Sequence, residues 1–109
     1  MTSITNIKKN VLSALEDIKA FDIVAIDIRK QVSIADYIII ASASSSRQAK
    51  ALAENIRDEM QKINIPLIGI EGGSGSEWVL VDLGDIIIHI MTPTIRLHYN
   101  LEELWVSDS

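Results

Sequence analysis

Residues 77–105, EWVLVDLGDIIIHIMTPTIRLHYNLEELW, decide the fold of this chain. Two apolar runs flank Leu83-Gly84-Asp85, a pattern typical of a β-hairpin with a tight turn. Side chains alternate between the two faces of a strand, so the two faces of the predicted hairpin carry different kinds of side chain. One face is wholly aliphatic and is expected in a dry core, with the members Val79, Val81, Ile86, Ile88 and Ile90.

The opposite face of the hairpin is chemically mixed. It carries an aromatic ring, a histidine, a methionine and a carboxylate, in the set Trp78, Leu80, Asp82, Ile87, His89 and Met91. Such a mixture suits a surface contacted by another protein better than a core. We therefore predict a partner-binding set that adds one turn residue and one tail residue: Trp78, Leu80, Asp82, Asp85, His89, Met91 and Tyr99.

Each of these residues also has an ordinary structural interpretation. Asp82 and Asp85 flank the turn, where aspartate often stabilises the backbone through hydrogen bonds. His89 could be a satisfied histidine on the sheet surface, and Met91 fits a core as well as a contact surface. Tyr99 could simply pin the tail onto the body. The sequence leaves these alternatives open.

The rest of the chain predicts further helices and strands. Helical spacing of apolar residues, strand-like β-branched runs and a proline at position 66 set their bounds. In order, we expect a helix at 4–19, strands at 21–28 and 36–42, a helix capped by the serine turn 42–46, a strand at 67–71, the hairpin, and a helical tail through Tyr99, Leu101, Leu104 and Trp105. This order, αββαβββα, predicts an α+β (α/β-like) fold with a mixed five-stranded sheet. With only two substantial helices, both on one face, the other face would stay partly uncovered.

Composition narrows the class of protein. The chain has 109 residues, 48% of them apolar, and predicts a single domain over residues 1–109. It has no cysteine, which excludes a disulfide framework and any thiolate metal site. The amphipathic start is unlike a signal peptide, and no apolar run approaches the roughly 18 residues of a membrane span. We expect a soluble, cytoplasmic protein with no membrane contact.

The charge distribution narrows the class of partner. The formal net charge is −5, and the ten Lys and Arg residues are scattered along the chain. Affinity for a phosphate backbone comes largely from clustered positive charge. Nucleic acid is therefore not expected as the main contact. A basic protein is the better electrostatic match.

A set of motifs along the chain resembles one known family. The motifs are IADYIII at 34–40, SSRQ at 45–48, G-x-E-G at 69–72, EWVLVDLGD at 77–85, H-x-M at 89–91 and R-x-x-Y-x-L-E-x-L-W at 96–105. Together they resemble the ribosomal silencing factor (RsfS, or Iojap-like) family over nearly the whole length. Small departures are Ala43, where the family often has glycine, and Asn100, where an acidic residue is common.

The resemblance implies a function. Members of the family bind the large ribosomal subunit through its ribosomal protein number fourteen and sterically block joining of the small subunit. Translation is thereby repressed under starvation, and a link to ribosome biogenesis is also implied. The family fold is similar to a small nucleotidyltransferase-like domain without known enzymatic activity, and no cofactor is implied. An acidic factor that docks on a basic ribosomal protein agrees with the charge distribution.

Two alternatives compete with this interpretation. A nucleotide- or metal-binding nucleotidyltransferase-like enzyme would need Asp27, Asp36, Asp82 and Asp85 to gather around a divalent ion, with the serine turn holding phosphate. The sequence disfavours it, because no Asp-x-Asp pair lies on a strand and the serine turn has no glycine. The second is a homodimer formed through the partly covered sheet face, which need not exclude ribosome binding because the dimer could dissociate.

Overall fold

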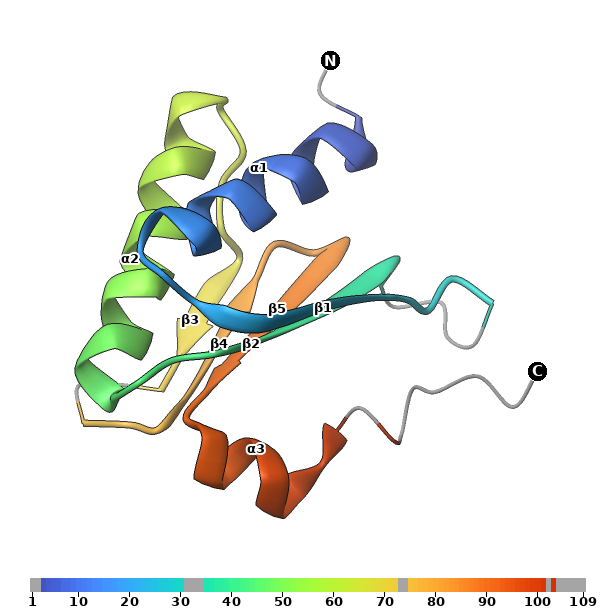
Figure 1. Ribbon diagram of the computed structural model, residues 1–109. Coiled ribbons are helices and arrows are strands. Elements are labelled where there is room, and N and C mark those ends of the chain that lie inside the picture. The colour runs from blue at the N-terminus through green and yellow to red at the C-terminus, as the bar shows by residue number, and fades with distance from the viewer. Residues whose placement is uncertain (1–2, 31–34, 73–74, 102, 104–109) are drawn as a thin grey trace.

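The fold is a five-stranded sheet with three helices, seen in a computed structural model that describes residues 3–30, 35–72, 75–101 and 103 (Figure 1). The elements are α1 (Ile4–Asp17), β1 (Phe21–Asp27), β2 (Tyr37–Ser42), α2 (Ser46–Lys62), β3 (Gly69–Glu71), β4 (Trp78–Asp82), β5 (Ile86–Met91) and α3 (Pro93–Tyr99). The predicted order αββαβββα is confirmed. The predicted tail residues Leu104 and Trp105 lie outside the described residues.

The sheet is mixed and has the strand order β1-β2-β5-β4-β3. β2 and β5 run parallel at its centre, and the three other pairings are antiparallel. Strands β4 and β5 form the predicted hairpin, with Leu80 opposite His89 and Val81 opposite Ile88. The α+β fold with a mixed five-stranded sheet is therefore confirmed.

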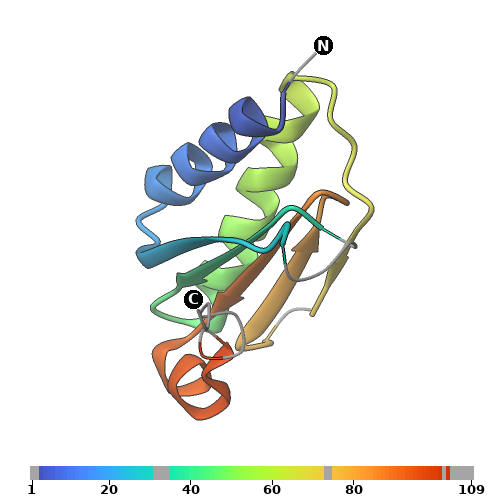
Figure 2. The same ribbon diagram turned by 90° about the vertical axis from the view of Figure 1, so that its right-hand side faces the viewer.

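The helices lie on opposite sides of the sheet. α1 and α2 cover one face, and α3 lies on the other side, beyond the end of β5 (Figures 1 and 2). Local signals place both long helices: the Ser3 hydroxyl accepts from the Asn6 N–H at 3.2 Å, and the Ser45 hydroxyl accepts from the Gln48 N–H at 3.1 Å. These N-caps satisfy donors that helix starts otherwise leave free. None of the described helices is long and apolar enough to cross a membrane.

The main core lies between the sheet and the two long helices. From the hairpin it takes the predicted aliphatic set, each member at most 1% exposed: Val79, Val81, Ile86, Ile88 and Ile90. From α2 it takes the buried residues Ala49, Leu52, Ala53, Ile56 and Met60, and half-buried Ile63 packs against them. The predicted register of the hairpin is therefore confirmed.

A second, smaller core lies on the other face of the sheet. Its buried members are Ile28, Ala35, Ile38, Ile40 and Met91, and half-buried residues that include Ile95 of α3 and Leu101 pack against them. The sequence predicted a partly uncovered face, and the structure refines this expectation. The part over β2 and the end of β5 is closed by α3 and by residues that flank β2, whereas the parts over β1 and β4 keep partial exposure.

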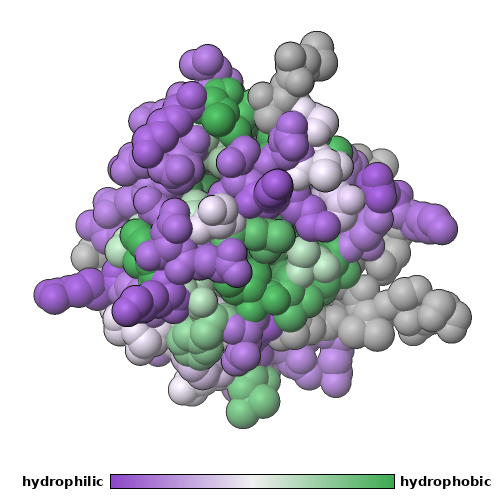
Figure 3. Space-filling view, turned by 45° about the horizontal axis from the view of Figure 1, so that its top comes forward, coloured by the Kyte–Doolittle hydropathy of each residue, from purple (hydrophilic) through white to green (hydrophobic). Residues whose placement is uncertain are grey.

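Strand β1 forms one edge of the sheet and is the least buried of the long strands. Apolar surface gathers in the middle of Figure 3, where β1 lies between the helix pair and α3. Phe21 and Val24 are among its exposed side chains, and the register with β2 shifts between them. Asp22, inside this bulge, has a φ of 49°. A bulge twists an edge strand and discourages accidental pairing with another chain.

Candidate protein-docking face

Four of the predicted binding residues come together on the hairpin, and a fifth joins them from α3. We call Trp78, Leu80, Asp82, His89 and Tyr99 the hairpin face. The first four alternate with the buried aliphatic set and are each half-buried, while Tyr99 is 53% exposed. This combination leaves aromatic, aliphatic and acidic groups accessible on one surface, as contact surfaces require.

Trp78 occupies the centre of the aromatic part of this face. Its indole Nε1 donates a hydrogen bond to Nδ1 of His89 at 3.0 Å, and the two rings lie 5.8 Å apart between centroids. The Tyr99 ring lies 4.9 Å from the indole at an interplanar angle of 50°. Neighbours from β5 and α3 therefore fix the indole, and such preorganised aromatic side chains are the usual anchors of protein interfaces.

The backbone carbonyl of Trp78 also has close neighbours on both Ser76 and Gly72. The Trp78 carbonyl accepts from the Ser76 hydroxyl at 2.7 Å. Gly72 has a φ of +95°, and a Cβ at this position would lie 2.6 Å from the same carbonyl oxygen. Only glycine fits such a close approach at a positive φ. The glycine at the end of the G-x-E-G motif therefore has a packing explanation next to the candidate site.

His89 is held in its neutral form by its surroundings. Burial lowers the pKa of His89 from its ordinary value, because the charged imidazolium loses hydration there. An Nδ1 that accepts a hydrogen bond carries no proton, so the neutral ring has its proton on Nε2. The structure therefore gives His89 a defined tautomer and a partner within the chain.

Tyr99 is placed by the anchoring of α3 at its first turn and at its middle. Thr92 precedes the helix; its N–H donates to the Glu77 carbonyl at 3.0 Å and its hydroxyl to the Glu77 carboxylate at 3.0 Å. Arg96 donates to the Ser42 hydroxyl at 2.8 Å and to the Asp22 carbonyl. α3 is thereby bound to β1, to β2 and to the start of β4.

Asp82 has a structural role in addition to its predicted one. Its Oδ1 accepts from the Gly84 N–H at 2.8 Å, and Gly84 has the positive φ of +90° that the turn requires. Asp85 has an exposed side chain, and its carbonyl accepts from the N–H groups of Asp36 and Tyr37. Asp82 therefore stabilises the turn through its side chain, whereas the Asp85 backbone ties the turn to the start of β2.

Met91 does not belong to the accessible face. Its exposed fraction is 0%, and it packs in the second core with Ile38 and Ile40 of β2. The prediction that Met91 contacts a partner is corrected here: α3 follows directly after β5 and the second core closes over this end of the strand. Met91 instead belongs to the second core, and Trp78 packs against this core.

The residues of the competing metal site are not gathered. Asp27 lies on β1 and Asp82 on β4, three strand positions away or roughly 14 Å. A hydrogen bond from the Arg29 side chain lowers the pKa of Asp27 to about 2, so Asp27 already has a cationic partner. Ser45 is used as the helix cap. Within the described part of the chain, no three His, Asp or Glu side chains group as metal ligands would.

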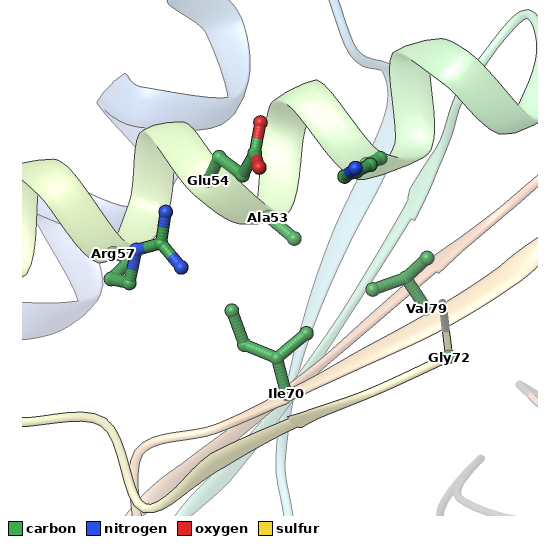
Figure 4. A pocket seen from close by; sticks show the side chains of 7 residues that line it. Ala53, Glu54, Arg57, Ile70, Gly72 and Val79 are labelled. Atoms are coloured by element: carbon green, nitrogen blue, oxygen red, sulfur yellow. The ribbon is translucent and has the colours of Figure 1, made fainter. Parts of the chain in front are cut away.

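A hollow on the other side of the sheet is lined by none of the predicted partner-binding residues. It has a volume of about 160 Å³ and lies between α2 and the edge formed by β3 and β4. In Figure 4, Ala53 points from α2 toward the strands, Ile70 and Val79 point up toward the helix, and Glu54 and Arg57 lie along the near side of α2. Its wall carries Lys50 and Arg57 as well as Glu54, so opposite charges offset one another. We therefore place the candidate site on the hairpin face.

Comparisons with known proteins agree on one family. The model of a family described as "Ribosomal silencing factor during starvation" matches residues 2–109. The ribosomal silencing factor RsfS of Chromobacterium violaceum is 41% identical over 94% of this chain and 84% of that protein. A mouse protein named "Mitochondrial assembly of ribosomal large subunit protein 1" is 32% identical over 87% of this chain and 43% of its own length.

The structural comparison gives the same result. An X-ray crystal structure of a protein from Chromobacterium violaceum superposes with a TM-score of 0.93 at 39% sequence identity. The superposition covers 99% of this chain and 92% of that one. Sequence similarity and overall fold thus agree over nearly the full length. The chain belongs to the ribosomal silencing factor family.

Proposed function

We propose that this chain docks on the large ribosomal subunit, through its basic ribosomal protein number fourteen, and prevents the small subunit from joining by occupying space. The observation that carries the proposal is the hairpin face, where Trp78, fixed by His89 and Tyr99, stands beside Leu80 and Asp82. Repression of translation in the cytoplasm under nutrient limitation would follow from this block. A part in large-subunit assembly is suggested by the name of the mouse relative.

The chemistry of the face determines how the docking would work. Trp78 and Leu80 would form the desolvated centre of the interface, because aromatic and aliphatic side chains lose least on leaving water. Tyr99 would extend this centre onto α3. Asp82, and Asp85 at the rim, would meet Lys or Arg of the partner and orient the encounter. The net charge of −5 favours a basic partner and disfavours direct contact with RNA.

Binding to separated ribosomal subunits tests the proposal. The chain is mixed with isolated large or small subunits and pelleted through a sucrose cushion. We expect saturable recovery with the large subunit and none with the small one. Equal recovery with both, or none with either, would contradict the proposal. Sedimentation of the chain alone, in the same buffer, shows whether the hairpin face is instead occupied by a second copy.

The charge of Asp82 can be tested separately from its role in the turn. Asp82→Asn keeps an oxygen that can accept from the Gly84 N–H, whereas Asp82→Ala removes both charge and acceptor. We expect Asp82→Asn to fold with a stability within about 0.5 kcal/mol of wild type. Its association with the large subunit should be slower and less sensitive to salt, because charges at an interface mainly steer the encounter.

Stopped-flow association rates over a range of salt concentrations provide the measurement. Asp82→Ala serves as the matched control, and it should lose stability in addition to the electrostatic effect. An unchanged rate and salt dependence for Asp82→Asn would show that the carboxylate serves the turn alone.

A further inference from the structure

The orientation of Trp78 depends on a single polar contact. The indole is a donor only, and within the described residues its nitrogen is paired with Nδ1 of His89 at 3.0 Å. The ring centroids of Tyr99 and Trp78 lie 4.9 Å apart, with an interplanar angle of 50°. This packing constrains the position of the indole without a hydrogen bond. His89 therefore supplies the directional restraint, and Tyr99 supplies packing.

The surroundings of His89 explain why it serves as an acceptor. On the hairpin its neighbours are Trp78, Leu80 and Asp82, and β2 on its other side presents Ile38, Ile40 and Ser42 on this face. The ionisable groups on the surrounding elements are Asp82 on β4, Glu71 on β3, and Arg96, His98 and Tyr99 on α3. Burial is the cause that lowers the pKa of His89, and none of these groups offsets it.

We propose that neutral His89 is the positioning residue of the docking face, and that its protonation releases Trp78 and weakens docking. This inference rests on the proposed function, which it deepens by adding a pH-dependent control of the same face. An imidazolium carries N–H donors on both nitrogens and can no longer accept from the indole. Donor would then face donor, and the indole would lose its directional restraint.

The way in which pH affects folding stability and docking follows from the lowered pKa of His89 in the folded chain. Because the folded chain holds the pKa of His89 below about 6.5, the unfolded chain binds more protons just below that pH. Folding stability is therefore unaffected above about pH 6.5, declines as the pH falls from that value to the folded pKa, and then levels off. Docking involves the folded chain alone, so it should weaken only as the pH falls through the folded pKa of His89.

Two substitutions separate the hydrogen bond from simple packing. Asparagine carries its acceptor oxygen at the δ position, where His89 has Nδ1, and it does not titrate. His89→Asn should therefore dock more tightly than His89→Leu near pH 7.5 and lose the pH dependence. His89→Leu fills similar space without an acceptor, and we expect docking about three- to tenfold weaker, the range for loss of one hydrogen bond.

Two readouts test the proposal, one of which needs no partner. The first is the indole N–H signal of Trp78 in NMR spectra of the free chain, assigned with Trp78→Phe because the chain holds two tryptophans. We expect it to shift in wild type as the pH is lowered from about 7.5 through the folded pKa of His89, to be displaced over the whole range in His89→Leu, and to stay constant in His89→Asn. The second readout is the dissociation constant for the large subunit at the two ends of this pH range.

The two readouts also distinguish the inference from the proposed function. If the indole signal follows these expectations but no variant binds the large subunit, the proposed function fails while the coupling of His89 to Trp78 stands. An indole signal that titrates equally in wild type and His89→Asn overturns the inference. It is equally overturned if His89→Leu docks as tightly as wild type while both remain folded by circular dichroism.

Discussion

Trp78→Ala is expected to weaken binding to the large ribosomal subunit by at least about thirtyfold, the loss associated with a central aromatic anchor. His89 and Tyr99 already fix the indole in the free chain. Binding therefore loses little free energy to the ordering of this side chain. Folding should be affected less than binding, because Trp78 is only half-buried. Equilibrium binding of labelled chain to purified large subunits gives the measurement.

Leu97→Ala is the matched control for this prediction. Leu97 lies on α3, two residues before Tyr99, and is 82% exposed, so it is a large apolar side chain outside the hairpin face. We expect its removal to change binding by less than about twofold, as for most residues outside an interface centre. Equal losses for Trp78→Ala and Leu97→Ala would mean that the hairpin face is not the docking surface.

Ile88→Ala should be the most destabilising of the simple substitutions considered in this chain. Ile88 is fully buried in the main core and lies between Val81 on β4 and Ile39 on β2. Truncation removes apolar contacts and leaves a cavity, which lowers the free energy of unfolding by about 2–5 kcal/mol. Urea unfolding followed by circular dichroism measures the change.

The neighbouring residue provides the control. Ile87 points to the opposite face of β5 and is half-buried. Ile87→Ala should therefore cost clearly less than Ile88→Ala in the same experiment. If the two costs were reversed, the assignment of the two hairpin faces would be wrong, and with it the placement of Trp78 on the accessible side.

The hairpin could be predicted in detail because its chemistry alternates. A shift of the register by one residue would exchange the aliphatic set for Trp78, Asp82 and His89, so only one register buries a consistent core. The turn signal around Gly84 and the caps of the long helices are equally local. These features need only neighbouring residues, and the sequence therefore predicts them well.

The second core could not be predicted in the same way. In β2 the continuous run Ile38, Ile39 and Ile40 predicts a strand, but because the run does not alternate it does not indicate what covers each face. The structure places β2 between β1 and β5, with both of its faces covered. Burial of Met91 follows from this arrangement, which depends on contacts far apart in the chain.

The sequence predicts which residues share the candidate site, but not how their side chains contact one another. It places Trp78 and His89 on one face, and the hairpin register makes them diagonal neighbours. The sequence did not specify that the indole donates to the imidazole, or that Asp82 accepts from Gly84. These contacts depend on side-chain rotamers and burial, which a pattern of residue types does not encode.

Joining of the ribosomal subunits is the measurement that tests the central claim most directly. Purified small and large subunits are combined at a magnesium concentration that permits joining, with and without an excess of the chain, and separated on a sucrose gradient. We predict that whole ribosomes decrease, that free subunits increase, and that the chain sediments with the large subunit; Trp78→Ala should leave joining intact. Whole ribosomes forming as readily with the chain as without it, and the chain remaining at the top of the gradient, would contradict the account.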